Sequence, residues 1–257
     1  MATETTVDPF LEVLEEWEHQ DREAVLEDLT DEQRRAVEHP GPLAVIAPPG
    51  SGKTRVLTAR VLDLARRGEA QATLALTFTR QAANEMRNRL ATRLSKEVLD
   101  AITIGTFHSV AYGLVRAHYR ELGFNREPGV CDPAYSRHLL RRAWREAGQP
   151  GDFEAVVQAV LAEKGQGRRP QDGDAGKVYE IYENYLRQAG LVDFDDMINL
   201  ALSILAEDIS PIPSTFRHVL VDEFQDTDER QVLILHLIAH DVEDVFAVGD
   251  PLQSIYR

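Results

Sequence analysis

Apolar residues along the chain alternate between short continuous runs and longer stretches with helical spacing. The short runs predict buried strands at residues 42–46, 73–77, 101–104, 218–221 and 245–248. Between them, apolar positions recur every three or four residues, which predicts helices at residues 53–67, 80–94, 107–119 and 228–240. Strands that alternate with helices are typical of a parallel sheet. The pattern therefore predicts an α/β fold, a parallel sheet with helices on both faces.

The middle of the chain lacks strand-like runs. Helical spacing dominates at residues 135–147, 153–164 and 177–188, and a Gly-, Pro- and Asp-rich loop at 165–176 separates the last two. We interpret residues 112–190 as an all-helical insertion between a first part of the α/β domain at 29–111 and a second part at 191–257. Residues 1–28 form an acidic arm with apolar residues at roughly helical spacing, namely Phe10, Leu11, Val13, Leu14 and Trp17.

The net charge of −15 at first argues against a nucleic-acid partner, because phosphates attract a basic surface. The charge is unevenly distributed, however. Residues 1–32 and 191–257 each carry a net −11, whereas residues 33–111 carry +6 and residues 112–190 carry +1. A nucleic-acid site in the basic part therefore stays possible. The single cysteine excludes an intramolecular disulfide, and no apolar window is long enough to cross a membrane, so we expect a soluble, cytoplasmic protein without membrane partners.

A Gly-rich segment follows the first predicted strand and opens a helix. It matches the P-loop pattern except that alanine replaces the first glycine, and such a loop wraps phosphate with its backbone amides. A lysine at its end neutralises the β- and γ-phosphates, and the next hydroxyl binds Mg²⁺. The segment predicts an ATP–Mg²⁺ site formed by Ala47, Pro48, Pro49, Gly50, Ser51, Gly52, Lys53 and Thr54.

A P-loop site needs a carboxylate at the end of a nearby strand to hold the metal ion. The predicted strand at residues 218–221 runs directly into Asp222 and Glu223. We expect Asp222 to hold Mg²⁺ with Thr54, and Glu223 to orient and deprotonate the attacking water.

The segment Asp222-Glu223-Phe224-Gln225-Asp226-Thr227 resembles motif II of the UvrD/Rep/PcrA-like DNA helicases of superfamily 1. Other segments resemble further motifs of this family in the same order: Gln33 (Q motif), 47–54 (motif I), 77–86 (Ia), 105–109 (Ib), 193–197 (the return from the helical insertion) and 248–257 (III). The resemblance covers residues 29–257 and implies a RecA-like P-loop domain. Motifs IV to VI, and with them the second RecA-like domain and its arginine finger, have no counterpart in this sequence.

The resemblance also implies roles for single residues. Gln33 would read adenine, although it could instead complete a helix capping box with Thr30. Arg55 would contact the nucleotide, although a surface salt bridge is an equally good reading. Lys53, Glu223 and Gln253 would act in catalysis, with Gln225 as a second sensor of the γ-phosphate. The implied DNA contacts are base stacking by Phe78 and Tyr256 and phosphate or sugar contacts by Thr79, Arg80, Thr106 and His108.

The sequence thus favours the ATP-binding N-terminal part of a UvrD-type helicase with a role in DNA repair or recombination. Its partners would be single-stranded DNA, junctions of single and double strands, and other repair or recombination proteins. Hydrolysis coupled to stepping would require the missing second motor domain, so this chain alone would turn over poorly. The alternative is a non-catalytic nucleotide- or DNA-binding module that regulates a full-length helicase. A third reading, a P-loop kinase, is excluded because motifs II and III would have no role in such an enzyme.

Overall fold

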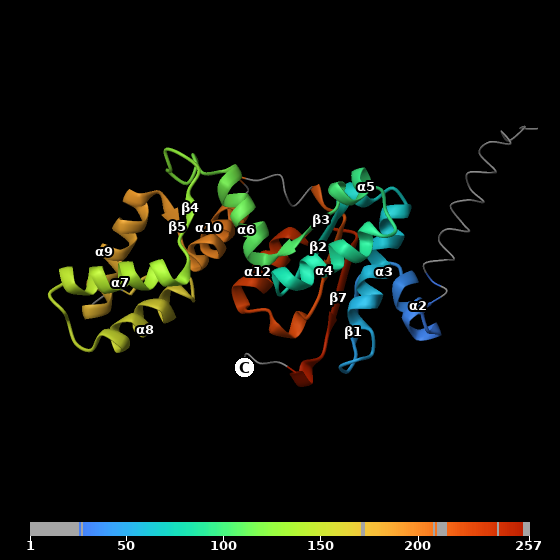
Figure 1. The fold of residues 1–257 in the computed structure, drawn as a ribbon, viewed down its shortest axis with the longest axis horizontal. Coiled ribbons are helices and arrows are strands. Elements are labelled where there is room, and N and C mark those ends of the chain that lie inside the picture. The colour runs from blue at the N-terminus through green and yellow to red at the C-terminus, as the bar shows by residue number, and fades with distance from the viewer. Residues whose placement is uncertain are drawn as a thin grey trace, which may run out of the picture. The chain divides into compact units, whose positions relative to one another are not determined.

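The computed structural model describes residues 26, 28–170, 173–207, 209, 215–240 and 242–253. These residues divide into two compact units (Figure 1). The sheet unit comprises the described parts of Met1–Thr106, Ser214–Thr227 and Asp241–Arg257, and the helical unit those of Phe107–Pro213 and Asp228–His240. The helical unit is thus longer than the predicted insertion at 112–190. Most of the predicted acidic arm lies outside the described residues.

In the described part of the chain, five parallel strands form the sheet, in the order β1-β7-β6-β2-β3. Each predicted strand is present within two residues of its predicted ends, and the predicted α/β fold class is confirmed. Strands β2 and β6 are buried along their whole length, as expected for the centre of a parallel sheet. The strands are β1 (Leu43–Ile46), β2 (Thr73–Thr77), β3 (Thr103–Thr106), β6 (His218–Val221) and β7 (Asp244–Gly249).

Helices of the sheet unit pack an apolar core against one set of strand residues. Leu57 and Val61 join Ala75, Leu220 and Phe246 in this core. The helices are α2 (Asp31–Glu38), α3 (Lys53–Arg66), α4 (Arg80–Ala91) and α5 (Lys96–Ala101), with 3₁₀ turns η1 (Ala70–Ala72), η2 (Phe224–Asp226) and η3 (Pro251–Gln253). The helix predicted at 80–94 ends at Ala91, and α5 follows it as a separate helix that the apolar pattern did not predict. The Ser95 hydroxyl accepts a hydrogen bond from the Val98 N–H, and this N-cap starts the new helix.

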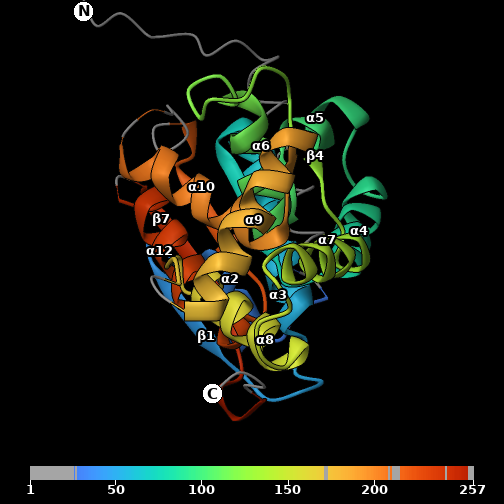
Figure 2. The ribbon, with the colours of Figure 1, turned by 90° about the vertical axis from the view of Figure 1, so that its left-hand side faces the viewer.

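In the helical unit, α7, α8 and α9 lie side by side and bury Leu140, Val160 and Tyr182 between them (Figure 2). A second group joins α10 to α6 and α12. The elements are α6 (Phe107–Ala117), β4 (Gly129–Val130), α7 (Pro133–Glu146), α8 (Phe153–Lys164), α9 (Gly173–Ala189), β5 (Leu191–Val192), α10 (Phe194–Ala206) and α12 (Glu229–Ile238), with β4 and β5 paired in parallel. Among the described residues, no helix is both long and apolar enough to span a bilayer.

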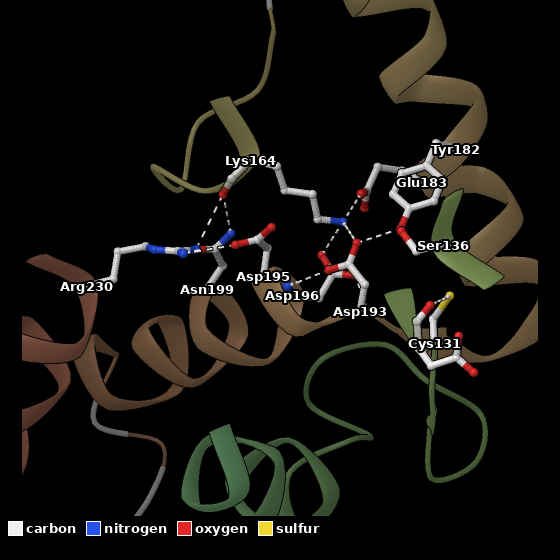
Figure 3. Close-up of polar contacts among 11 residues, drawn as sticks. Cys131, Ser136, Lys164, Tyr182, Glu183, Asp193, Asp195, Asp196, Asn199 and Arg230 are labelled. Carbon is white, nitrogen blue, oxygen red and sulfur yellow. Dashed lines mark hydrogen bonds and ion pairs between the residues drawn. The ribbon is translucent and has the colours of Figure 1, made fainter. Parts of the chain in front are cut away.

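A buried lysine lies at the centre of a polar cluster in the helical unit (Figure 3). The Lys164 ammonium, at the end of α8, is 2.9 Å from Asp193 and 2.7 Å from Asp196, and it also pairs with Glu183. The Tyr182 hydroxyl donates to Asp193 at 2.7 Å. Burial raises the pKa of Asp196 to about 7, even though the Lys164 ammonium lowers it. These contacts tie α8, α9 and α10 together within the unit, and we call them the Lys164 cluster.

Candidate nucleotide site

The loop between β1 and α3 has the geometry of a phosphate-binding loop. Gly50 and Gly52 have φ angles of +76° and +87°, in the left-handed region that favours glycine. Gly52 is the N-cap of α3 and provides no capping side chain, so the first N–H groups of the helix remain available for an anion. Lys53 is 9% exposed, and its ammonium donates to the Ala47 carbonyl at 3.1 Å. The loop therefore folds back over its own lysine.

Backbone hydrogen bonds hold other parts of this loop in place. The Ala47 N–H donates to the Gly249 carbonyl at 3.2 Å, which joins the loop to the end of β7, and the Ser51 N–H donates to Pro48 at 3.3 Å. Pro49 is exposed. The buried Ser51 hydroxyl has no hydrogen-bond partner among the described residues, which fits a loop that has polar groups to offer to a ligand.

Both ends of the Gln33 side-chain amide are engaged. Its Oε1 accepts from the Thr30 N–H at 3.0 Å and completes the capping box of α2. Its Nε2 donates to the Ser51 carbonyl at 2.8 Å. A Cβ on Gly52 would lie 2.7 Å from that nitrogen, so a side chain at position 52 would displace the Gln33 amide from this contact. The structure therefore has the capping role that the sequence left open and adds a contact with the phosphate loop, while adenine reading by Gln33 stays a prediction.

Thr54 and Asp222 lie together, as expected for a metal-binding pair. The Thr54 hydroxyl donates to Asp222 Oδ2 at 3.4 Å, although the two residues are 168 positions apart in the sequence. Thr54 is in the first turn of α3, and Asp222 follows β6 directly. A hydroxyl and a carboxylate are the oxygen ligands with which Mg²⁺ is held in P-loop sites. The donor set therefore fits the expected ion.

Asp222 is 3% exposed, and this burial raises its pKa to about 6, with a further rise from the neighbouring Glu223 charge. Hydrogen bonds from the Glu223 N–H and the Thr54 hydroxyl, together with the Lys53 charge, act in the opposite direction. A buried carboxylate disfavours its charged form unless a cation lies beside it. The site is thus electrostatically prepared for a positive ion.

A chain of hydrogen bonds connects the end of β6 to the end of β7. Glu223 has a φ of +50°, a strained backbone for a residue other than glycine, and its Oε2 accepts from Gln225 Nε2 at 2.9 Å. Gln225 Oε1 accepts from the Asp250 N–H at 2.9 Å, and Asp250 Oδ2 accepts from Gln253 Nε2 at 2.6 Å. Three of the residues assigned to catalysis and γ-phosphate sensing, Glu223, Gln225 and Gln253, are therefore joined in one network.

Asp250 holds this network together, although its sequence context did not predict a role for it. Asp250 is 5% exposed, and its other oxygen accepts from the Leu252 N–H at 3.0 Å. The available signal was an acidic residue placed directly between the end of a buried strand and a proline.

The residues predicted to bind DNA are only partly brought together. Phe78, Thr79 and Arg80 follow β2, and Thr106 ends the neighbouring β3, in register with Thr77. The carboxyl ends of adjacent parallel strands thus place these four residues at one edge of the sheet. Phe78 is 38% exposed, and Thr79 caps α4 by accepting from the Ala82 N–H.

Three other predicted site residues have different surroundings. His108 belongs to the helical unit, where its ring lies 5.5 Å from that of Phe194. Arg55 pairs with Asp28 at 3.5 Å, which matches the salt-bridge reading of this residue. Tyr256 lies outside the described residues.

Comparison with known proteins gives a consistent picture. The model of the UvrD/REP helicase N-terminal domain family matches residues 29–257. Over 253 residues the chain is 34% identical to a DNA helicase II of Haemophilus influenzae, covering 90% of the chain and 35% of the relative. It is 33% identical over 250 residues to the DNA helicase II of Escherichia coli K12, with the same shares. Identity to the ATP-dependent DNA helicase UvrD1 of Mycobacterium tuberculosis is 36% over 264 residues, covering 90% of the chain and 34% of the relative. The chain therefore spans about a third of the length of these relatives.

Proposed function

Because the chain belongs to the UvrD/REP helicase N-terminal domain family, we propose that it is the ATP-binding part of an ATP-dependent DNA helicase. It would bind ATP–Mg²⁺ and single-stranded DNA, including junctions of single and double strands, in the cytoplasm. Its biological role would lie in DNA repair or recombination. The relatives in the comparison are named as DNA helicases, which supports this substrate class.

The observation that carries the proposal is the contact between Thr54 and Asp222. Two segments far apart in the sequence place a hydroxyl and a buried carboxylate 3.4 Å apart, beside the start of α3. Lys53 is close enough to Asp222 for its charge to lower the carboxyl pKa. A P-loop lysine, a metal-binding hydroxyl and a strand-end carboxylate are the parts that hold a nucleoside triphosphate and its metal ion.

Each residue of the site would have a separate task. The loop amides at 47–52 and the Lys53 ammonium would bind the phosphates, and Thr54 and Asp222 would hold Mg²⁺. The bound nucleotide supplies the phosphoanhydride bond whose hydrolysis releases free energy. Glu223 would accept a proton from the attacking water at a carboxylate oxygen. Through their hydrogen bonds, Gln225 and Gln253 would transmit a change in the position of the Glu223 side chain to the segment after β7.

DNA binding would use the edge of the sheet formed by the ends of β2 and β3. Phe78 would stack on a base, and Thr79, Arg80 and Thr106 would contact phosphate or sugar. Stacking of one base on an aromatic side chain contributes about 1–3 kcal/mol. His108 and Tyr256 complete the set of proposed contacts.

Efficient hydrolysis coupled to stepping along DNA would require a second motor domain. An arginine finger, which such a domain would supply, contributes about 10³–10⁵ in rate in related phosphoryl-transfer systems. We therefore expect the chain by itself to bind nucleotide, turn it over slowly and separate no strands. Measurable unwinding by the pure chain would contradict this part of the proposal.

Titration calorimetry with a non-hydrolysable ATP analogue and Mg²⁺ tests the nucleotide site. Lys53→Ala removes the charge that balances the phosphates, and affinity should fall by about ten- to a hundredfold, as for loss of a charge-assisted hydrogen bond. Lys96→Ala is the matched control, because Lys96 is an exposed lysine at the start of α5. Equal affinity of Lys53→Ala and the parent would refute the proposed site.

The alternative, a non-catalytic module that regulates a full-length helicase, predicts different kinetics. Under the main proposal, single-stranded DNA raises the slow ATP turnover of the chain, and Glu223→Gln abolishes that turnover while ATP still binds. A non-catalytic module would bind ATP, but the parent and the Glu223→Gln variant would show the same background ATP turnover.

A further inference from the structure

The sheet unit has a groove along α3 and α4 that shares only Arg55 with the residues predicted to contact the nucleotide. Its volume is about 430 Å³, and residues of both helices and of the segments next to them line it. The floor is apolar and includes Leu29, Leu62 and Leu90. A volume of this size is in the range of pockets that hold ligand groups or inserted side chains. We call this feature the arginine groove, for the residues at its rim.

Three arginines line the groove, and they are not equally neutralised. Arg55 pairs with Asp28, and Arg89 pairs with Glu85 one helical turn away. Arg93 is exposed and has no ion pair with any residue that the structure describes. With three arginines and two carboxylates among its lining residues, the groove has a net charge of +1. An acidic partner with apolar side chains would complement both its rim and its floor.

The chain carries a segment of this chemistry directly before Leu26 in the sequence. Residues 1–25 contain eight acidic residues and a single basic one, Arg22. The apolar side chains of this segment, from Phe10 to Trp17, recur at roughly helical spacing. Amphipathic helices that place apolar anchors into a groove are a common mode of peptide recognition.

The position of the chain supports the same partner. Leu26 is buried in the core of the sheet unit, and Asp28 and Leu29 themselves line the groove. The C-terminal end of the arm, Asp28, therefore lies at the rim of the groove. Residues 18–25 separate the apolar anchors from the buried Leu26, and eight residues span at most about 26–29 Å when extended. Tethering also gives a short segment an effective concentration on the order of millimolar.

We propose that residues 8–25 of this chain bind the arginine groove of the same molecule. The apolar anchors of the arm lie against Leu29, Leu62 and Leu90, and its carboxylates face Arg89 and Arg93. The arm thereby covers basic surface beside α3 and keeps other polyanions, such as nucleic acid, from this face. The proposal does not depend on the nucleotide site, because none of its contacts involves the residues that would hold ATP or Mg²⁺.

The fluorescence of Trp17 tests the proposal in the full chain. Trp17 and Trp144 are the two tryptophans, so Trp144→Phe leaves Trp17 as the sole emitter. Acrylamide quenching of Trp17 should be about twofold or more weaker in this chain than in a free peptide of residues 1–25, because a ring held against an apolar floor is shielded. Equal quenching in the chain and in the peptide would overturn the proposal.

Variants of the groove separate docking from other causes of shielding. Arg89→Glu with Arg93→Glu should restore quenching to the value of the peptide. Arg169→Glu with Arg187→Glu, which reverses two exposed arginines of the helical unit, should leave it unchanged. Raising the salt from about 0.1 M to about 1 M shortens the screening length from about 10 Å to 3 Å and should also loosen the arm, which gives a second measurement without substitutions. Shielding that resists both the charge reversal and the salt would contradict docking in this groove.

Varying the protein concentration shows whether the arm of the same molecule or that of a second copy occupies the groove. Shielding that stays constant on dilution, with a monomer mass by light scattering, is the expected result. Shielding that disappears on dilution together with a dimer would show that the arm of a second copy fills the groove, and would overturn the intramolecular proposal.

Discussion

Lys164→Met removes the cation at the centre of the Lys164 cluster and keeps a side chain of similar length. Lys164 is 2% exposed, and its ammonium lies within 3 Å of Asp193 and Asp196. Methionine fills the same space but provides no charge. The variant therefore leaves three carboxylates facing one another in a poorly hydrated site.

The size of the loss follows from how each carboxylate can respond. Removing one partner of a buried ion pair typically costs about 3–5 kcal/mol. The Glu183 side chain is 32% exposed and can turn toward water. Asp196, with its pKa already raised to about 7, can take up a proton. We therefore expect the lower end, about 3 kcal/mol near neutral pH, which corresponds to a fall in Tm of about 6–12 °C for a chain of this size.

Urea unfolding followed by Trp144 emission measures this change. Trp144 reports on the helical unit, because its ring packs edge-on against Phe153 and its Nε1 donates to the Pro150 carbonyl at 3.0 Å. Arg168→Ala is the matched control. It breaks the exposed pair between Arg168, just after α8, and Glu163 in the last turn of that helix, and the urea midpoint should hardly move.

The pH dependence provides an independent check on the same reasoning. Without the ammonium, the carboxylates of the folded variant bind protons more tightly than those of the unfolded chain. The stability of Lys164→Met should therefore rise as the pH falls, and its deficit relative to the parent should shrink toward pH 5. A loss no larger than that of Arg168→Ala, or a deficit that is independent of pH, would refute the electrostatic account of the cluster.

Three further predictions concern other parts of the chain. Asp196→Asn should flatten the dependence of stability on pH. The pKa of Asp196 is raised to about 7 in the folded chain, against about 3.9 when unfolded, so protonated Asp196 contributes stability near pH 4 that is lost as the pH rises through 7. An unchanged pH dependence of the free energy of unfolding in urea titrations would contradict this. Gly52→Ala places a Cβ 2.7 Å from Gln33 Nε2, so it should lower Tm and nucleotide affinity more than Gly68→Ala, which has a similar φ but open space. Phe78→Ala should weaken binding of a single-stranded oligonucleotide by about 5- to 150-fold in fluorescence anisotropy and leave ATP affinity unchanged.

Much of the fold and of the nucleotide site could be predicted from local sequence. The five strands, the helix after the Gly-rich loop and the capping box of Thr30 and Gln33 depend on residues close together in the chain. The same is true of the two acidic residues that follow β6. Two helix starts that were not predicted also depend on local residues, but their signals are weaker. Ser95 starts α5, and Asp193 starts α10 with its own capping box.

Contacts between distant segments could not be predicted from pattern alone. The sequence places a threonine after one strand and an aspartate after another, but only the parallel sheet brings Thr54 to Asp222. The role of Asp250 depends on the meeting of the ends of β6 and β7. Gln33 had two possible partners, and the fold adds a third, the Ser51 carbonyl.

The sequence by itself determined the α/β class, the phosphate loop and the chemistry available at the strand ends, because periodicity and turn residues act over a few positions. Only the tertiary structure decided which charges are buried together. Lys164 ends an ordinary predicted helix in the sequence, yet three carboxylates from two other helices and the turn before α10 surround it in the fold. Burial and electrostatic coupling depend on distances in space, and the packing of whole helices sets those distances.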